Sequence, residues 1–159
     1  MSSNYNIDTN LILVGDAKKN MKRLPDKSIQ CIVTSPPYYG LRDYGHKEQI
    51  GLELSPEQYI KKLVSVFREA YRVLKDDGTL WINIGDSYAG SGKGAATHAS
   101  EKHWKQLTNK GALDKTIRHY KSAIHKKKDL IGIPWMLAFA LKKDGWYLRQ
   151  DIIWSKKNP

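Results

Sequence analysis

The feature that most constrains this chain is a strand-like run that ends in two consecutive prolines. The apolar run 29–33 leads directly into Thr34-Ser35-Pro36-Pro37-Tyr38-Tyr39-Gly40. Proline cannot donate a ladder hydrogen bond, and each proline restricts the residue before it, so the chain stays stiff and extended there. The sequence therefore predicts a hydroxyl group, two free backbone carbonyls and a tyrosine ring at the carboxyl end of a strand. That end of an open α/β sheet is where ligands bind.

Short apolar runs predict three strands, which cover residues 11–14, 29–33 and 79–84. A short helix over 17–24 is expected between the first two strands, and a longer helix between the second and the third. This alternation predicts right-handed crossovers and a mainly parallel sheet with flanking helices, in a single α/β domain. In such a sheet, Asn83 and Asp86 are expected at the same edge as the proline pair.

The longer helix has a clear start and a clear apolar face. Ser55 is expected to cap it, Pro56 to occupy its first turn, and Asp76-Asp77-Gly78 to end it. Spacing of three and four residues predicts one buried face. The members of that face are Tyr59, Leu63, Val66, Phe67, Ala70, Tyr71 and Leu74. The stretch 38–51 between this helix and the preceding strand has no clean period and is expected to be a surface loop.

The last part of the chain predicts one more helix and an extended end. Pro134 stands in the first turn of an amphipathic segment that Asp144-Gly145 ends. Residues 146–149 and 151–154 are rich in aromatic and β-branched side chains, which predicts extended structure, such as the edge of a hairpin.

The charge of the chain is strongly asymmetric. The net charge is +11 and the isoelectric point is near 9.6, which favours a polyanionic partner such as nucleic acid over a merely basic soluble protein. Most of the excess lies between residues 98 and 128, where aromatic and histidine side chains are interleaved. The candidate DNA-binding residues are Arg42, Asn83, Lys102, Lys105, Arg118, Lys126, Lys127 and Lys128. A solvated loop is the alternative for this segment, and without acids or cysteines at ligand spacing its histidines predict no metal site.

The single cysteine and the N-terminal residues indicate the kind of cellular compartment in which the chain is expected. Cys31 lies inside an apolar pattern and cannot form an internal disulfide, so we expect a small core residue in a reducing compartment. Residues 1–10 are polar and contain no apolar block of a signal peptide, and no apolar run approaches the ~18 residues of a membrane span. The sequence therefore predicts no membrane association.

Ser35-Pro36-Pro37-Tyr38 resembles the [DNS]-P-P-[YF] tetrapeptide of the DNA amino-methyltransferases. Those enzymes transfer a methyl group from S-adenosylmethionine to the exocyclic nitrogen of cytosine or adenine. The similarity extends to Gly15-Asp16-Ala17, Leu24-Pro25-Asp26, Asp77-Gly78-Thr79-Leu80 and Ile152-Ile153-Trp154. It covers most of the chain except a basic insertion over about 90–127, which we expect to be flexible. The resemblance implies a partial Rossmann-like methyltransferase fold and a bacterial or phage enzyme of the cytoplasm.

The resemblance also implies roles for particular residues. Ser35 and the backbone carbonyl of Pro36 would accept the two amino hydrogens of a flipped base, and Tyr38 would stack on its ring. Asp16, Ser35 and Pro36 would contact the methyl donor, although Asp16 can equally be a helix cap without a function. Asn83 could read the edge of a base or be a satisfied polar residue at a strand end. Serine in the first position favours N4 of cytosine over N6 of adenine.

The sequence departs from the family in one segment. Residues 86–92 have the spacing of the family's cofactor loop, but no proline follows Asp86 and no amphipathic helix follows Gly92. We therefore expect a flexible loop on the target side. In the family branch where the catalytic segment comes first, the cofactor loop and the target-recognition region lie beyond the segments found here. The chain is thus expected to be the catalytic portion, completed by a further portion or by a second chain, or else a non-catalytic DNA-binding remnant.

Overall fold

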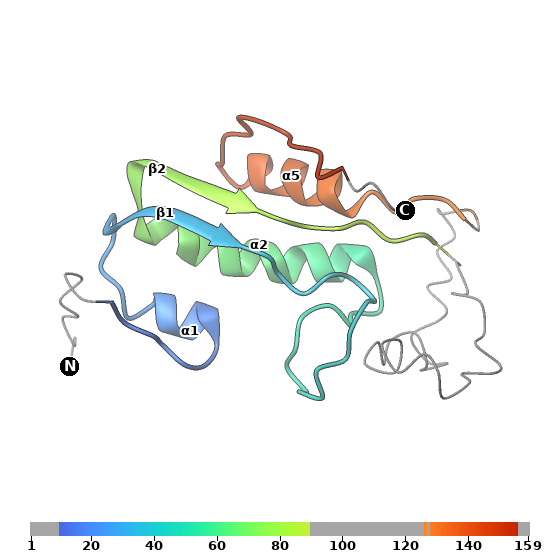
Figure 1. The fold of residues 1–159 in the computed structure, drawn as a ribbon, viewed down its shortest axis with the longest axis horizontal. Helices are drawn as coiled ribbons and strands as arrows, with labels where there is room; N and C mark the ends of the chain where they lie inside the picture. Colours follow the sequence, from blue (N-terminus) through green and yellow to red (C-terminus); the bar gives the residue numbers. More distant parts are fainter. Residues whose placement is uncertain (1–9, 90–125, 127, 156–159) are drawn as a thin grey trace.

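The structure is a computed structural model of the 159-residue chain, and it describes residues 10–89, 126 and 128–155. The described elements, in chain order, are helix α1 (Ala17–Met21), strand β1 (Ile29–Thr34), helix α2 (Pro56–Val73), strand β2 (Leu74–Ile82) and helix α5 (Ile133–Lys143) (Figure 1). Among the described residues, the helices are too short or too polar to cross a membrane.

The two strands pair in parallel, and α2 connects them. Ile32 lies opposite Leu80 and Thr34 opposite Ile82, which confirms the predicted parallel pairing. Helix α2 has the predicted start, since the Ser55 side chain accepts a hydrogen bond from the backbone N–H of Gln58. Its predicted end is wrong. The helix stops at Val73, and residues 76–78 belong to β2, where they cause a register shift against β1.

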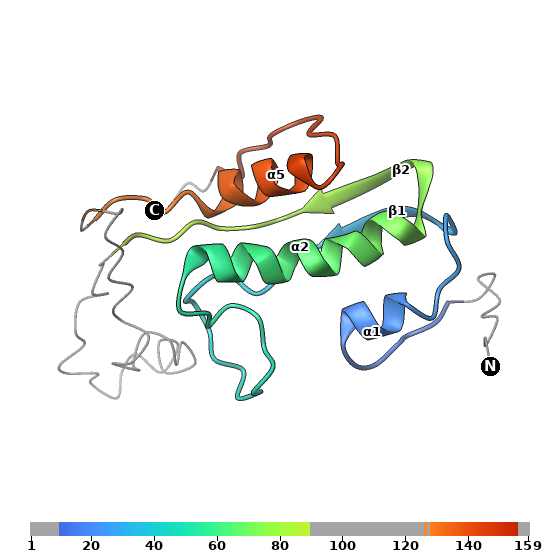
Figure 2. The same ribbon diagram turned by 180° about the vertical axis from the view of Figure 1, so that it is seen from behind.

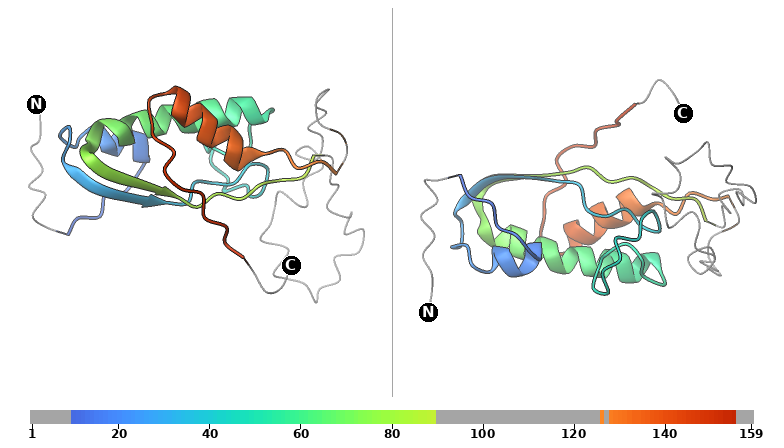
Figure 3. Two further views of the ribbon diagram at one scale, coloured as in Figure 1. Left: turned by 90° about the horizontal axis from the view of Figure 1, so that it is seen from above. Right: turned by 60° about the horizontal axis from the view of Figure 1, so that its bottom comes forward.

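All three helices lie on one side of the two strands. The right-hand view of Figure 3 shows the strands above and the helices below, and Figure 2 shows the molecule of Figure 1 from behind, with α2 in front of β1. The core forms between the helices and the strand side chains that point toward them. Tyr59, Leu63, Phe67 and Ala70 of α2 are buried there as predicted, whereas Tyr71 is 53% exposed. The α5 residues of this core are Ile133, Leu137 and Leu141.

The other face of the sheet is uncovered by the described residues. Cys31 lies beside Thr79, and Val33 lies beside Trp81, and all four side chains are exposed. Val33 is 77% and Trp81 49% exposed. The prediction that Cys31 is a core residue is therefore wrong, because alternation along β1 places it on the face opposite the helices. A parallel sheet is normally covered on both faces.

Three predicted segments differ from the structure. Residues 11–14 form no strand, and Ile12 and Val14 are 89% and 90% exposed. The first helix ends at Met21 rather than at residue 24. The Arg72 guanidinium of α2 donates hydrogen bonds to the backbone carbonyls of Met21 and Leu24 at this end of the helix. Residues 146–154 are extended but pair with no described strand, and the chain runs past the strands there (Figure 3). The apolar runs at 11–14 and 152–154 have no neighbouring described strand to pair with, which explains both the exposure and the missing ladders.

Candidate active site

The Ser-Pro-Pro-Tyr segment lies where the sequence predicted it, directly after β1. The last backbone hydrogen bond of the sheet runs from the Asn83 N–H to the Thr34 carbonyl at 2.9 Å. Beyond it, the segments that follow β1 and β2 separate. Ser35 is exposed. Among the described residues, no hydrogen bond reaches the Ser35 hydroxyl or the Pro36 carbonyl. Both groups are therefore available to a ligand at the carboxyl edge of the sheet.

Asn83 and Gly85, which follow β2, fix the Tyr38 ring. The Tyr38 hydroxyl lies 3.2 Å from Asn83 Oδ1 and donates a hydrogen bond to it. A Cβ atom at Gly85 would come within 2.9 Å of the Tyr38 ring, so only glycine permits the ring to lie this close to the backbone. The expectation that Asn83 shares the edge with Tyr38 is confirmed. In this structure the Asn83 side chain orients a tyrosine.

Only one of the two proline carbonyls is free, which corrects the prediction of two. The Pro37 carbonyl accepts a hydrogen bond of 2.7 Å from the hydroxyl of Tyr59, which lies in α2. Tyr59 is fully buried, and its ring packs against Tyr39 with centroids 5.4 Å apart. Burial and then the negative charge of Glu53 raise the pKa of the Tyr59 hydroxyl above its ordinary value. Sequence reasoning counted Tyr59 only as a core residue.

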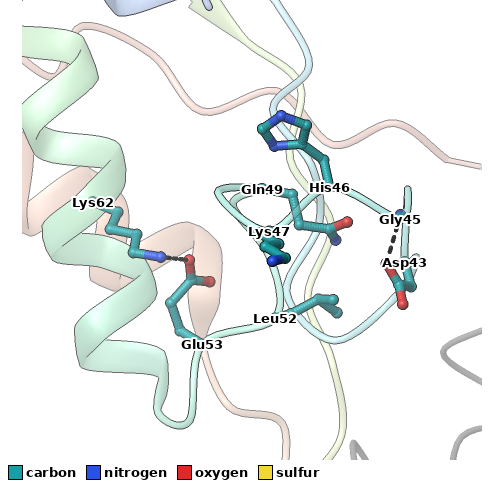
Figure 4. A pocket seen from close by; sticks show the side chains of 8 residues that line it. All are labelled: Asp43, Gly45, His46, Lys47, Gln49, Leu52, Glu53 and Lys62. Atoms are coloured by element: carbon teal, nitrogen blue, oxygen red, sulfur yellow. Dashed lines mark hydrogen bonds and ion pairs between the residues drawn. The ribbon is translucent and has the colours of Figure 1, made fainter.

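The loop predicted over 38–51 contains neither helix nor strand, but it is well anchored. The Gly40 N–H donates to the Gly51 carbonyl at 2.7 Å, which closes the loop at its base. The Gly51 N–H donates to Glu53, whose side chain is 2% exposed and pairs with Lys62 of α2 at 2.9 Å. A cavity of about 400 Å³ lies between this loop and α2, and Figure 4 shows the side chains that line it. None of the residues that line it belongs to the Ser-Pro-Pro-Tyr segment.

Residues 87–89 and 128–131 form a clamp, by which we mean the paired backbones of these two stretches. The Ala89 N–H donates to the Asp129 carbonyl, and the Lys128 N–H donates to the Ala89 carbonyl, both at 2.7 Å. The Ser87 hydroxyl donates to the Tyr39 carbonyl at 2.9 Å. The clamp thus joins Ala89 and Lys128, which flank the stretch 90–127 in sequence, and attaches them to the loop that carries Tyr38. No sequence pattern predicted this pairing.

Asp86 has a structural partner that the sequence did not predict. Its carboxylate accepts hydrogen bonds from the backbone N–H groups of Gly132 and Ile133 at 3.0 Å, and from Ser87 at 2.8 Å. Gly132 is the N-cap of α5 and has no side chain with which to cap the helix. Asp86 therefore caps α5 from a distant part of the chain.

The remaining predicted residues are only partly described. Asp16 caps α1, because its Oδ1 accepts from the Lys19 N–H at 2.8 Å. No hydrogen bond between described residues links it to the Ser-Pro-Pro-Tyr segment. The side chains of Arg42, Lys126 and Lys128 are exposed. The other predicted DNA-binding residues, Lys102, Lys105, Arg118 and Lys127, lie outside the described residues.

Comparison with known proteins bears directly on this site. Residues 29–159 match a family model described as DNA methylase, of the N6 and N4 methyltransferases, and the matched region contains the whole Ser-Pro-Pro-Tyr segment. The chain belongs to the DNA amino-methyltransferases. This confirms the resemblance that rested on the tetrapeptide and its flanking segments.

The DNA amino-methyltransferases similar to this chain include three bacterial type II methyltransferases. M.Cfr9I of Citrobacter freundii is 54% identical over 144 residues, which are 91% of this chain and 45% of that protein. M.XycI of Xanthomonas campestris pv. cyanopsidis is 51% identical over 144 residues, which are 91% of this chain and 45% of that protein. M.SmaI of Serratia marcescens is 48% identical over 147 residues, which are 92% of this chain and 48% of that protein. The chain spans about half the length of the curated relatives it matches.

Proposed function

We propose that this chain is the catalytic portion of a site-specific DNA methyltransferase that modifies N4 of cytosine in a flipped base. The observation that carries the proposal is the arrangement of Ser35, the Pro36 carbonyl and the Tyr38 ring at the end of β1. No described residue hydrogen-bonds to the two acceptors, and the ring is held by Asn83 and Gly85. Two acceptors followed directly in sequence by a held aromatic ring match an exocyclic amino group on a planar base. N6 of adenine is the alternative target, since its amino group offers the same two hydrogens.

The proposed reaction begins with a base outside the helical stack, because pairing occupies the amino hydrogens inside the duplex. Ser35 Oγ and the Pro36 carbonyl accept the two N–H hydrogens and draw the nitrogen toward tetrahedral geometry. Tyr38 stacks on the ring and holds the nitrogen lone pair in line with the donor methyl. Bond formation between the nitrogen and the methyl carbon of a bound donor would break the carbon–sulfur bond with its electron pair going to sulfur, and one amino proton would leave to solvent. Neither a cysteine nor a covalent enzyme intermediate takes part.

S-adenosylmethionine would supply the electrophilic methyl group. The hydrogen-bonding groups at the edge of the sheet suit part of such a molecule. We propose that Asp16, Ser35 and Pro36 contact it. The Asp16 cap uses Oδ1, and no hydrogen bond from a described residue reaches Oδ2, which can accept from the hydroxyl or amino groups of a ligand. Asp86 does not complete this set, because its carboxylate caps α5. We therefore propose that a further portion of polypeptide completes the donor pocket.

The uncovered face of the sheet supports the need for such a portion. Val33, Trp81 and the run 152–154 are apolar and exposed on the described part of the chain. Covering them would stabilise the sheet by about 25 cal/mol for each Å² of apolar area removed from water. We propose that polypeptide equivalent to the remaining half of the relatives packs here, either in the same protein or as a second chain. Because the relatives named above are bacterial, we also propose that the protein acts in the bacterial cytoplasm.

DNA would bind on the side of the clamp. We propose that Arg42, Asn83, Lys126, Lys128 and the basic insertion contact the phosphates and bases around the target. Support comes from the charge of the sequence and from the clamp, which attaches the residues on either side of the insertion to the Tyr38 loop. Binding through lysine and arginine releases counterions and weakens steeply with salt.

A methyl-transfer assay tests the proposed function. The isolated chain is incubated with labelled S-adenosylmethionine and DNA, alone and together with the separately produced remaining portion of the Citrobacter freundii relative. We call the second mixture the complemented enzyme. The isolated chain is expected to give background incorporation and the complemented enzyme clear incorporation. Nucleoside analysis then separates N4-methylcytosine from N6-methyladenine, and the adenine product would refute the cytosine assignment.

The double substitution Ser35→Ala with Tyr38→Ala separates an enzyme from a binding remnant. The complemented variant should lose turnover and keep salt-dependent DNA binding. Robust incorporation by the isolated wild-type chain would contradict the proposed need for a further portion. Methylation by the complemented wild type at the same rate as by the double variant would contradict the assigned residues.

A further inference from the structure

The Ser-Pro-Pro-Tyr segment has a single soft backbone torsion. The pyrrolidine rings lock φ of Pro36 and of Pro37, and a following proline restricts ψ of both Ser35 and Pro36. Rotation about ψ of Pro37 therefore remains as the main freedom between Ser35 and Tyr38. This rotation turns the Pro37 carbonyl and swings the Tyr38 backbone relative to the Pro36 carbonyl. Whatever holds the Pro37 carbonyl therefore fixes the segment.

The Tyr59 hydroxyl holds that carbonyl. It donates to the Pro37 oxygen at 2.7 Å, across 22 residues of sequence. Tyr59 is fully buried, so this donor has no water to compete for it. We infer that Tyr59 is a positioning residue for the reaction: it sets the Pro37 torsion and thereby the geometry between the Pro36 carbonyl and the Tyr38 ring. The inference rests on the proposed function for its consequence in catalysis, but the positioning itself is a property of the chain.

Two contacts fix Tyr59 itself. It lies in the first turn of α2, where its N–H donates to the Ser55 carbonyl at 3.1 Å. Its ring packs against that of Tyr39, which directly follows the segment it orients. Burial raises the pKa of its hydroxyl above the ordinary value, so the group stays protonated and remains a donor in alkaline solution as well as at neutral pH. The hydroxyl therefore connects the start of the long helix rigidly to the catalytic segment.

The backbone of Gly51 also lies close to this segment. A Cβ atom on Gly51 would lie 3.1 Å from the Tyr38 carbonyl oxygen and 3.4 Å from Pro37 Cβ, and Gly51 has a positive φ of +113°. Gly51 is in turn bound to the buried Glu53. The backbone of Gly51 therefore lies so close to Pro37 and Tyr38 that a side chain at position 51 would crowd them, while the Tyr59 hydroxyl donates a directional hydrogen bond to the Pro37 carbonyl.

The kinetic test is Tyr59→Phe in the complemented enzyme, because phenylalanine keeps the buried ring and removes only the hydroxyl. The expected result is a fall in kcat of about tenfold, the value of one lost directional contact, with KM for DNA and DNA affinity unchanged. Tyr71→Phe is the matched control, since it removes an exposed hydroxyl from the same helix. It should leave kcat unchanged. A Tyr59→Phe enzyme with wild-type kcat, or one with raised KM and unchanged kcat, would overturn the inference.

A second measurement needs no methylation. In the isolated chain with ¹³C-labelled carbonyls, Tyr59→Phe should shift the Pro37 carbonyl resonance, while the Gly51 carbonyl, which accepts from Gly40, stays in place. An unmoved Pro37 resonance would show that the hydroxyl does not hold the carbonyl, and the positioning role would fail. If the complemented wild type is inactive while Pro37 shifts, the proposed function fails and the positioning of the segment stands.

Discussion

Replacing Asp86 should destabilise the fold, because its carboxylate caps α5 from another part of the chain. The capped N–H groups belong to Gly132 and Ile133, which lie 46 and 47 residues away in sequence. Ile133 is fully buried, so its N–H cannot turn to water when the acceptor is removed. Asp86→Ala thus leaves a buried donor unpaired at the start of a helix.

The size of the effect follows from those contacts. An unsatisfied buried donor costs about 1–3 kcal/mol, and loss of a capping carboxylate costs about 0.5–2 kcal/mol. The two values describe overlapping contacts and do not simply add, so we expect Asp86→Ala to lower the free energy of unfolding by about 2–4 kcal/mol. Asp86→Asn keeps an oxygen acceptor and loses the charge that favours a helix N-terminus, and about 1 kcal/mol is expected.

Urea unfolding of the isolated chain, followed by circular dichroism, measures these differences. Asp151→Ala serves as the matched control, because Asp151 is exposed and no described residue binds its side chain. Its effect should stay within about 0.5 kcal/mol. Amide exchange at Ile133 should accelerate in Asp86→Ala more than exchange in the middle of α2, because the cap is lost locally.

One result would refute this reasoning. If Asp86→Ala unfolds at the wild-type urea concentration, the carboxylate does not stabilise α5. If the same variant also loses affinity for S-adenosylmethionine in the complemented enzyme, Asp86 would belong to a cofactor loop after all. Its spacing to Gly90 and Gly92 would then be functional.

Three further predictions test other parts of the molecule. Replacing residues 90–127 by a short glycine–serine linker should leave the stability of the chain nearly unchanged, because the clamp already holds Ala89 beside Lys128. DNA affinity should fall, and the slope of log affinity against log salt should fall by about 0.9 for each lost phosphate contact; an unchanged slope would contradict DNA contact by the insertion. Val33→Lys should change the stability of the isolated chain by less than about 0.5 kcal/mol, since Val33 is 77% exposed, yet prevent complementation. Leu54→Lys, at an 85% exposed site away from the strands, is its control, and equal complementation by both variants would argue against docking on the open face. Finally, the folded chain keeps the Tyr59 proton that the unfolded chain releases above about pH 10. From that pH upward, the free energy of unfolding of the wild type should therefore fall relative to that of Tyr59→Phe, by at most about 1.4 kcal/mol per pH unit. Urea titrations from pH 8 to 11 measure the difference, and a gap that does not change with pH would refute the buried-hydroxyl interpretation.

Local patterns identified much of the fold and the central motif. The proline pair placed Ser35 and Tyr38 at the end of a strand, because two prolines stop a strand without any help from other parts of the chain. The Ser55 cap and the three- and four-residue spacing placed α2 for the same reason, since both signals act within one or two turns. These features are properties of short segments, and the structure confirms them.

Burial was less predictable than secondary structure. The run 11–14 and Cys31 have the composition of buried strands, and both are exposed in the described part of the chain. An apolar run indicates that a segment gains from being covered, but it does not identify the covering element. For the same reason, nothing in the sequence separated the covered face of β1 from the open one.

Only the tertiary structure decided how the motif is held. Tyr59, Gly85, Ser87 and Asp86 lie far from their partners in sequence, and their contacts depend on which helix packs on which strand. The Tyr59 hydroxyl lies 22 residues from the carbonyl it binds, and Asp86 lies 46 residues from Gly132. Sequence periodicity cannot report such pairs, because it records the preference of each segment and not the choice among partners. The sequence alone determined that the Ser-Pro-Pro-Tyr segment follows β1, and three-dimensional packing determined which side chains give that segment its geometry.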